Sequence, residues 1–450
     1  MVELSKSQDN EIGDGTTGVV VLAGSMLEQA QTLLDIGIHP LKISDGFEKA
    51  WEMAVSKVES IATELDIEAN DHEELIKWAM TALGSKVVSK FKRQLAEIAV
   101  KAVLSVADME RKDVNFDLIK VVGKTGGSLA DTSFIDGIVI DKDFSHPQMI
   151  KEVHDAKIAI LTCPFEPPKL KTKHNLEIKT KEDYEKLYEI EQKYFIDMVQ
   201  CVKDSGANLV LCQWGFDYEA NHLLMHNKLP AVRWVGGVEI ELIAIATGGR
   251  IIPRFQEIAP EKLGRAGVVK EVSFGTTNER MIVIQEWSNS RAVTILVRGG
   301  NKMIVAEAQR CIHDALWVVR NMVKNHMVVP GGGASELACS LHIQEQADKI
   351  DSIEQYSVRA FAEALEEIPL CLATNSGYNS IQYLSDLKKQ QVENNCPYFG
   401  VDAMNTGNNH MIEEGIYESV MSKKEQLMLA TQVVKMILKI DDVIAPASYE

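Results

Sequence analysis

The 450-residue sequence lacks the long hydrophobic runs of a membrane protein. Its apolar stretches, such as VVVLAG and IELIAIA, are much shorter than the roughly 18 residues that a membrane-spanning helix needs. The first residues, MVELSKSQDN, contain no apolar core typical of a secretory signal. We therefore expect no membrane partner, and we expect the protein to be located in the cytosol.

Paired cysteines and an excess of positive charge are missing as well. The seven cysteines are scattered and odd in number, and none belongs to a C-x-x-C motif or to the Cys/His spacing of a zinc site. Free or buried thiols in a reducing compartment are the expected state. The formal net charge is -18, which argues against nucleic acid as a partner.

The order of sequence patterns predicts one domain inserted into another. A single core rarely grows beyond about 250–300 residues, so a chain of this length should form two or three domains. Helical periodicity comes first, short β-branched runs separated by glycine follow, and helical periodicity then returns. The helical stretches are 18–66, 72–109, about 301–345, 351–368 and much of the last fifty residues. The two ends of the chain would then form one α-helical domain, with an α/β domain between them.

The first helical stretch contains a break at 38–40, where the sequence is IHP. Ser44 and Asp45 are candidate caps for the helix that follows this break. Apolar residues recur after them at helical spacing and would form the buried face of that helix: Phe47, Ala50, Ala54, Val58 and Ile61.

Residues 165–200 differ from their surroundings, because two prolines and a lysine-rich segment precede a charged helix. One side of this helix would carry Tyr184, Leu187, Tyr194, Phe195 and Met198. The segment is either a surface helix of the α/β domain or a mobile protrusion that docks on another molecule.

The segment Gly13-Asp14-Gly15-Thr16-Thr17 is the first candidate for chemistry. Glycines let backbone N–H groups approach a phosphate, and a helix that begins at Thr16 would add its positive N-terminal end. Asp14 would repel a bare phosphate, but it fits the site if it holds a Mg²⁺ ion that bridges to the phosphate. A tight turn with an aspartate cap is the alternative, because short glycine motifs often carry no function.

Gly331, Gly332 and Gly333 precede another expected helix and give a second place where backbone could lie against a ligand. Asp314 lies upstream in a helical segment whose neighbours Ile312 and Leu316 are apolar. A carboxylate there could orient or deprotonate an attacking water molecule. A plain loop with a cap and a solvated helix charge are the alternatives for these two features.

Two familiar nucleotide motifs are excluded. Gly123-Lys124-Thr125 is similar to the end of a Walker A loop, but Leu118 stands where that motif requires its first glycine. No G-x-G-x-x-G follows an expected strand, so a Rossmann dinucleotide site is unsupported.

Many motifs along the chain resemble those of group II chaperonins, in the order found in that family. They are GDGTT at 13–17, TALGSK at 81–86, KTGGSLADT at 124–132, DKDFSHPQM at 141–149, KIAILTCPFEPPK at 157–169, QWGFDYEANHLL at 213–224, LPAVRWVGG at 229–237, IELIAIATGGR at 240–250, FGTT at 274–277, RGGNKM at 298–303, HDAL at 313–316, GGGASE at 331–336 and ILKIDDVI at 437–444. The resemblance covers essentially the whole chain.

The resemblance implies a multidomain α/β fold with three domains. They are a mainly α-helical equatorial ATPase domain at 1–65 and 331–450, a small α/β intermediate hinge domain at 66–140 and 297–330, and an α/β apical domain at 141–296 with a helical protrusion near 165–200. The helix expected at DYEANHLLMHN would then lie near the surface that meets unfolded proteins.

The same resemblance assigns roles to individual residues. Asp14 would be a catalytic Mg²⁺ ligand, and Asp314 would orient the water that attacks ATP. The other nucleotide-binding residues would be Gly15, Thr16 and Thr17 at the phosphates, Ser85 and Lys86 at the γ-phosphate, Gly332 against the nucleotide, and Asp402, Glu418 and Lys423 around the ribose and base.

The family's activity implies the cofactors ATP and Mg²⁺. The implied partners are other chaperonin subunits in a hetero-oligomeric double ring and unfolded client proteins such as actin and tubulin. Members of the family carry a further stretch before the GDGTT loop, with L-G-P-type and N-D-G-A-T segments that contact nucleotide. We therefore expect an N-terminally truncated member that binds ATP more weakly, and assembles into rings less well, than a complete subunit. The alternative is a non-hydrolysing chaperonin-like protein that only binds clients or partners.

Overall fold

The computed structural model describes residues 1–64, 72–84, 87–108, 110–167, 178, 180–273, 280–286, 292–442 and 444. The chain divides into two compact units. Unit 1 comprises Met1–Val100, Asp108–Asp113 and Arg310–Glu450, and unit 2 comprises Lys101–Ala107 and Val114–Gln309. Unit 1 therefore combines the two ends of the chain, whereas the boundaries of the three expected domains remain a prediction.

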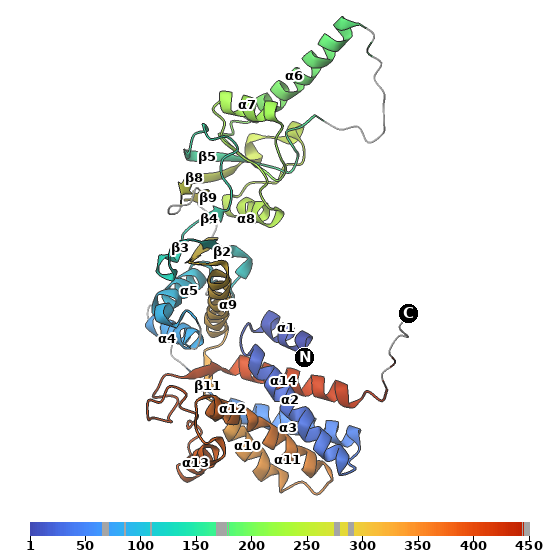
Figure 1. The fold of residues 1–450 in the computed structure, drawn as a ribbon, viewed down its shortest axis with the longest axis vertical. Coiled ribbons are helices and arrows are strands. Elements are labelled where there is room, and N and C mark those ends of the chain that lie inside the picture. The colour runs from blue at the N-terminus through green and yellow to red at the C-terminus, as the bar shows by residue number, and fades with distance from the viewer. Residues whose placement is uncertain are drawn as a thin grey trace. The chain divides into compact units, whose positions relative to one another are not determined.

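Unit 1 is mainly helical (Figure 1). Its helices are α1 (Val2–Glu11), α2 (Thr16–Asp35), α3 (Pro40–Ile61), α4 (His72–Leu83), α10 (Ala334–Ala347), α11 (Glu354–Leu365), α12 (Glu367–Asn375), α13 (Ser380–Glu393) and α14 (Val420–Leu438). Helices α5 (Lys92–Val106) and α9 (Lys302–Lys324) run from one unit into the other. A three-stranded antiparallel sheet, in the order β1-β11-β12, is formed by Thr63–Glu64, Met327–Pro330 and Tyr417–Ser419.

The core of unit 1 joins helices from the two ends of the chain. Helices α2 and α3 pack against α11 and α14. Met26, Phe47 and Phe361 are fully buried, and the rings of Phe47 and Phe361 meet edge to face with centroids 5.8 Å apart. Burying one such side chain contributes about 1.5–3 kcal/mol. The buried face expected for α3 is confirmed, because all five of its predicted residues are buried.

Two expectations about element boundaries were wrong. Helix α3 begins at Pro40 rather than near Ser44, and its cap is His39, whose Nδ1 accepts a hydrogen bond from the backbone N–H of Leu41. Proline suits the first helical position because its φ is already helical and it has no N–H to satisfy. The helical stretch expected over 301–345 is interrupted by strand β11, whose residues Val328 and Val329 are buried.

Unit 2 is built on two sheets. The larger has the order β4-β9-β8-β5-β6-β7, and the smaller has the order β2-β10-β3. The strands are β2 (Ile119–Thr125), β3 (Ser133–Ile135), β4 (Ile138–Ile140), β5 (Glu152–Leu161), β6 (Leu209–Cys212), β7 (Ala231–Val232), β8 (Gly264–Ser273), β9 (Arg280–Gln285) and β10 (Val293–Gly299). Its other helices are α6 (Lys181–Asp204), α7 (Tyr218–His226) and α8 (Gly237–Thr247). Short 3-10 helices of the chain are Ser89–Phe91, Phe116–Leu118, Leu129–Asp131, Phe255–Glu257 and Pro260–Lys262.

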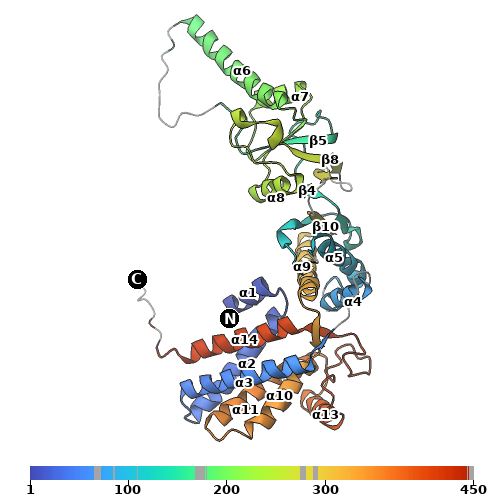
Figure 2. The ribbon, with the colours of Figure 1, turned by 180° about the vertical axis from the view of Figure 1, so that it is seen from behind.

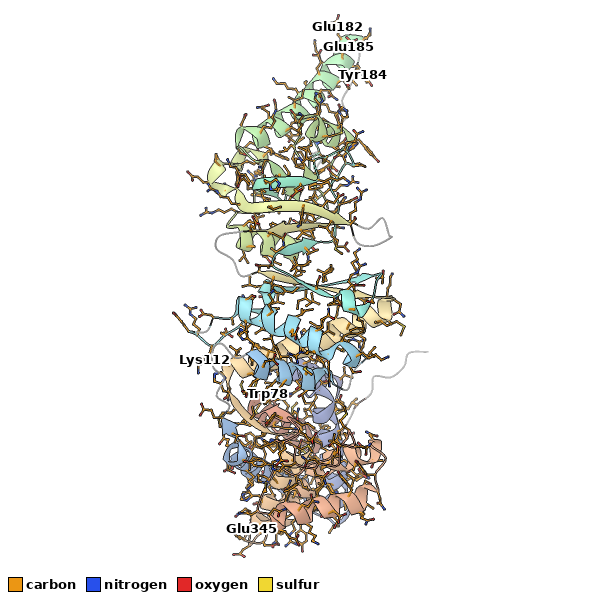
Figure 3. The ribbon with its side chains drawn as sticks, turned by 90° about the vertical axis from the view of Figure 1, so that its left-hand side faces the viewer. Trp78, Lys112, Glu182, Tyr184, Glu185 and Glu345 are labelled. Atoms are coloured by element: carbon orange, nitrogen blue, oxygen red, sulfur yellow. The ribbon has the colours of Figure 1, made fainter. Side chains whose placement is uncertain are left out.

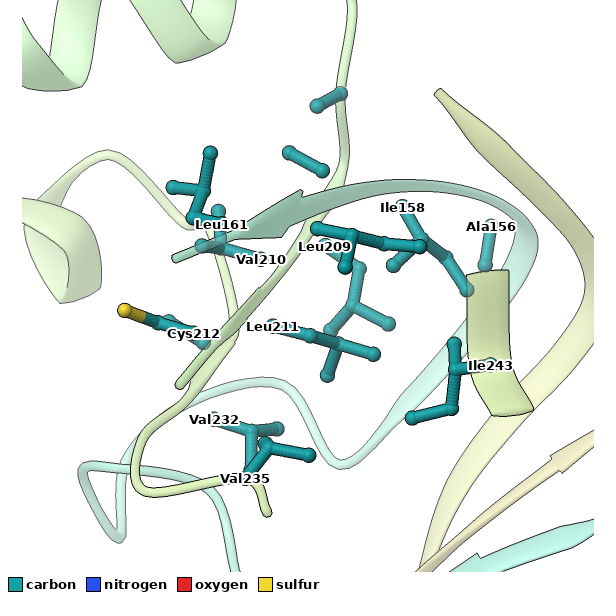
Figure 4. Close-up of a cluster of buried hydrophobic side chains, with 14 of the residues drawn as sticks. Ala156, Ile158, Leu161, Leu209, Val210, Leu211, Cys212, Val232, Val235 and Ile243 are labelled. Carbon is teal, nitrogen blue, oxygen red and sulfur yellow. The ribbon is translucent and has the colours of Figure 1, made fainter. Parts of the chain in front are cut away.

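The core of unit 2 forms around the parallel strands β5, β6 and β7 (Figure 4). Ile158, Leu209, Leu211 and Val232 are fully buried there, together with Ile243 of α8. Side chains on both faces are buried in β6, in β7 and over the last four residues of β5, so these stretches are continuous apolar runs rather than alternating patterns.

Helix α6 is buried at one end only. Phe195 and Met198 lie in the core of unit 2, whereas Tyr184 is 65% exposed. Figure 3 shows Glu182, Tyr184 and Glu185 at the far end of the helix, where they point away from the rest of unit 2. Residues 168–177 and 179 of the expected protrusion lie outside the described residues. No described helix is both long and apolar enough to span a membrane.

Candidate functional site

A cavity of about 350 Å³ lies in unit 1 and brings together segments from both ends of the chain. The loop before α2 contributes Asp14 and Gly15, and strand β12 contributes Glu418. The rest of its lining comes from α2, α4, α9, α12 and α14, with Lys423 and Gln426 on the last of these. A separate cavity of about 330 Å³ beside α10 and α13 is lined by none of the predicted site residues.

The loop that carries Asp14 is held in shape by two glycines and a buried glutamine. Gly13 and Gly15 adopt left-handed φ values of 70° and 76°. The Gly15 N–H donates to the Asp14 carboxylate at 2.8 Å, and the Gln8 side chain donates to the Asp14 carbonyl at 2.8 Å. Helix α2 begins at the next residue, Thr16, as the sequence predicted. The loop therefore places a carboxylate and the positive end of a helix at the same cavity.

Gly13 is also the point at which α9 approaches this loop. A Cβ atom added to Gly13 would lie 2.0 Å from Cγ of Trp317. The Asn321 side chain donates to the carbonyl of Ile12 at 3.0 Å. The loop is thereby fixed against a helix that lies about three hundred residues further along the chain, and its shape depends on that helix.

Gly13→Ala should lower the free energy of unfolding of unit 1 by at least about 2 kcal/mol, because alanine is strained at this φ and its methyl group overlaps the Trp317 ring. Hydrogen exchange at the amides of α2 would measure the change. Gly24→Ala on α2 is the matched control, since nothing lies within 4 Å of its Cβ position and helical alanine is favoured over glycine. Equal destabilisation by both substitutions would contradict this account.

Asp314 lies on α9, one helical turn before Val318, which lines the cavity. Its apolar neighbours Ile312 and Leu316 are buried, so the expected packed face is confirmed. Asp9, His313 and Asp314 form a group whose metal-ligating atoms all lie within 4.8 Å of one another. Asp14, the expected Mg²⁺ ligand, is not in this group.

His313 is already engaged through one ring nitrogen. The Trp317 indole N–H donates to its Nε2 at 3.0 Å, so the lone pair at that atom is already used. The carboxylates of Asp9 and Asp314 are therefore better candidates than the His313 ring for binding a cation in this group. Oxygen ligands are those that Mg²⁺ prefers.

A buried ion triad lies behind the cavity. The Lys423 ammonium contacts the carboxylates of Glu336 and Glu418. Glu336 and Lys423 are almost fully buried, whereas the Glu418 side chain is 31% exposed and lines the cavity. Burial alone would lower the pKa of Lys423, but the two carboxylates outweigh this effect and raise the pKa above its ordinary value. The lysine thus stays charged and holds Glu418 at the cavity wall.

Burial raises the pKa of Glu418 from its ordinary 4.5 to about 7. The neighbouring Lys423 ammonium lowers this pKa, while the negative charges of Glu336 and Asp14 raise it further. Water in the cavity reaches the exposed third of the side chain and weakens these effects. Glu418 therefore holds its proton at a higher pH in the folded chain than in the unfolded chain.

The stability of unit 1 should depend on pH through Glu418. Because its folded pKa is raised, its contribution to stability is fully present below about pH 4.5 and is lost as the pH rises towards 7. The free energy of unfolding of the wild type, relative to that of Glu418→Gln, should therefore fall across this window. Hydrogen exchange at α14, compared for the two proteins at several pH values, would measure it. A difference that does not change with pH would refute the assignment.

The remaining predicted residues lie in several places. Asp14, Gly15, Glu418 and Lys423 line the cavity. Thr16 and Thr17 begin α2, next to the lining residue Gly15 but not in the lining themselves. Ser85 and Lys86 lie outside the described residues.

Gly332 lies against Val401, the residue before Asp402, and neither Gly332 nor Asp402 is in the cavity lining. The carbonyl of Gly332 accepts a hydrogen bond from the backbone N–H of Val401 at 2.8 Å. Both carboxylate oxygens of Asp402 accept backbone N–H groups, from Met404 at 3.1 Å and from Gly407 at 2.8 Å. Asp402 is buried and shapes its own loop, so a contact with a ribose would compete with these bonds.

Sequence reasoning missed several residues of the cavity. Ser422 and Gln426 are four residues apart on α14, on the same turn as Lys423, and this helical spacing is the signal that could have found them. Trp78 stacks on Tyr417 with centroids 5.1 Å apart, and both line the cavity. The buried Oγ of Ser419, another lining residue, has no hydrogen-bond partner within the described part of the chain.

The residues present fit a phosphate ligand that carries a divalent cation. The start of α2 supplies backbone N–H donors, Ser419 supplies a hydroxyl without a partner, and Trp78 with Tyr417 supplies an aromatic wall. Asp14 supplies a carboxylate oxygen for a hard cation at the cavity, and Asp9 and Asp314, which are not in the cavity lining, supply a second pair one helical turn before the lining residue Val318.

The two units make this a multidomain α/β protein. The open-state monomer of a group II chaperonin from Methanococcoides burtonii superimposes with a TM-score of 0.70 at 34% identity, covering 95% of this chain and 100% of that one. The chain therefore has the group II chaperonin fold, and the predicted fold class is confirmed. The profile of the TCP-1/cpn60 chaperonin family matches residues 1–448. The chain therefore belongs to the TCP-1/cpn60 chaperonin family.

Individual relatives agree with this family. T-complex protein 1 subunit epsilon of Encephalitozoon cuniculi is 52% identical over 445 residues, which are 99% of this chain and 83% of that protein. The thermosome subunit of Methanocaldococcus jannaschii is 40% identical over 445 residues, which are 99% of this chain and 81% of that protein. The thermosome subunit beta of Methanothermobacter thermautotrophicus is 39% identical over 448 residues.

Proposed function

We propose that this chain is an ATP-hydrolysing chaperonin subunit that assists the folding of unfolded proteins. The observation that carries the proposal is the cavity in unit 1. Its lining combines Asp14 and Gly15, which lie just before the start of α2, with the Glu418–Lys423 ion pair. Family membership supports the chaperonin role.

In this proposal the chain's own residues bind and orient the reactants. The N–H groups at the start of α2 would bind phosphate oxygens, and Asp14 would hold a Mg²⁺ ion, which would supply charge neutralisation at the phosphates when bound. Asp314 accepts a hydrogen bond from the attacking water and orients it. Glu418, held by Lys423, accepts hydrogen bonds from a ribose hydroxyl at the opposite wall.

The same proposal covers domains, partners and location. Residues 1–65 and 331–450 would act as the equatorial domain, 66–140 and 297–330 as the hinge, and 141–296 as the apical domain that meets clients. The partners would be other chaperonin subunits in a hetero-oligomeric double ring and unfolded proteins such as actin and tubulin. The support for a cytosolic location is the similarity to a T-complex protein 1 subunit.

Co-expression with the other chaperonin subunits, followed by size-exclusion chromatography with mass detection, tests the proposal. At least part of the chain should elute in a ring-sized complex even if assembly is impaired, and the purified complex should release phosphate from Mg-ATP. A chain that elutes alone and releases no phosphate would contradict the proposal and would favour a non-hydrolysing protein that only binds clients or partners.

A further inference from the structure

Helix α7 presents two histidines on the face opposite its buried side. Asp217 caps the helix by accepting a hydrogen bond from the Glu219 N–H, and Ala220 and Leu224 are fully buried. His222 and His226 are exposed. Figures 1 and 2 show α7 beside α6 from opposite sides, and the two helices pack against each other. The histidines therefore lie on a short helix whose position is fixed by its packing.

The two imidazoles are arranged as a pair. They are four residues apart, so they occupy the same helical face. Their rings are nearly parallel, with 7° between the planes, and their centroids are 6.4 Å apart. Neither ring makes a hydrogen bond or ion pair within the described part of the chain. A shared ion would need one nitrogen of each ring at about 2.0–2.1 Å, the usual zinc–imidazole distance, so these exposed side chains would have to rotate to bind it.

We propose that His222 and His226 form a two-imidazole chelate for a divalent first-row transition-metal ion such as Zn²⁺ or Ni²⁺. Neutral imidazole is a preferred ligand of these ions, and two histidines at this spacing on one helix face are a known way of binding one. This site is separate from the nucleotide cavity, which lies in unit 1, and the inference does not rest on the proposed ATPase function.

Two opposing electrostatic effects act on a cation at the C-terminal end of α7. His226 is the last residue of α7, and the negative end of the helix dipole favours a cation there. The Lys203 ammonium, which donates to the Asn227 side chain at 3.0 Å, lies at the same end and opposes it. Among the described residues, the group of three or more metal-ligating side chains lies elsewhere, at Asp9, His313 and Asp314. The ion would therefore have two protein ligands, and its other coordination positions would be open to water or to a side chain of a second molecule.

Titration calorimetry of the full-length chain with Ni²⁺ tests the proposal. All proteins would carry His313→Gln, which removes the imidazole of the group in unit 1. Replacing either histidine, in His222→Gln or His226→Gln, should weaken Ni²⁺ binding at the tightest remaining site by at least about tenfold. Loss of a group that only supports a metal ligand already costs about that much, and loss of a direct ligand should cost no less. His154→Gln is the matched control, because His154 is an exposed histidine on strand β5.

The outcomes separate cleanly. Similar losses in the two α7 variants, with the control unchanged, support a shared site. Unchanged affinity in both α7 variants, or an equal loss in the His154 control, would overturn the proposal. The substituted side chains are exposed, so circular dichroism should show all the proteins folded, and the comparison does not depend on ATP hydrolysis.

Discussion

Asp314→Asn should lower the rate of Mg-ATP hydrolysis by about 10²–10⁴-fold while changing nucleotide affinity little. In the proposed mechanism this carboxylate acts on the attacking water, so its loss removes an interaction made at the reaction step rather than on binding. The asparagine has nearly the same shape, and the buried neighbours of Asp314 on α9, such as Ile312 and Leu316, are untouched. Phosphate release at saturating ATP and binding of a fluorescent nucleotide would measure the two effects.

Two further variants sharpen this experiment. Asp348→Asn changes an exposed carboxylate of unit 1 that pairs with Arg359, and it should leave hydrolysis unchanged. Asp9→Asn removes the other carboxylate of the group around Asp314 and should also slow hydrolysis if the group holds a cation. Full activity in Asp314→Asn would remove this residue from the mechanism, whereas loss of nucleotide binding would show that it acts on affinity.

Lys423→Met should lower the free energy of unfolding of unit 1 by about 3–5 kcal/mol, the usual cost of removing one partner from a buried ion pair. The substitution leaves Glu336 buried without its cation, and one of its oxygens already lacks a hydrogen-bond partner among the described residues. It also frees Glu418 from the position it holds at the cavity. Hydrogen exchange at α14 would measure the loss, and nucleotide affinity should fall with it.

The neighbouring residue provides the matched control for this change. Lys424 lies on the same helix and pairs with Glu59, but both side chains are substantially exposed. Lys424→Met should therefore cost less than about 1 kcal/mol. The double substitution Glu336→Gln with Lys423→Met should recover part of the loss, since it removes one of the two stranded charges. Equal costs for Lys423→Met and Lys424→Met would refute a special role for the buried triad.

Periodicity made much of the helical structure predictable. Helix α3 shows all five of its expected apolar residues buried, and α2 begins at Thr16 where the glycine loop ends. The error at Ser44 arose because two good capping residues lie inside a helix that proline starts earlier. Strand β11 was missed because MVVP is too short to be told from a helical run by its pattern.

The candidate site could be predicted only in part, because local sequence does not encode long-range contacts. The motif at Asp14 was predicted as a candidate phosphate loop, but nothing in it indicated that Trp317 packs on Gly13. Likewise Lys423 was assigned a nucleotide role by resemblance, whereas its burial between Glu336 and Glu418 follows from the packing of α10, α14 and β12. Such contacts are set by tertiary structure and have no signature in a short window.

Because unit 1 is formed from the two ends of the chain, its core cannot be completed early during synthesis on the ribosome. Helices α2 and α3 are translated before unit 2, whereas α11 and α14, which cover them, follow only after all of unit 2. Unit 2 is contiguous apart from a short segment, so it can acquire its structure while the chain is still growing. Until translation is nearly finished, the apolar faces around Met26 and Phe47 remain without their partners, and closing so long a loop is slow. Nascent α2 and α3 therefore expose apolar surface of the kind that chaperones bind until α11 and α14 have been made.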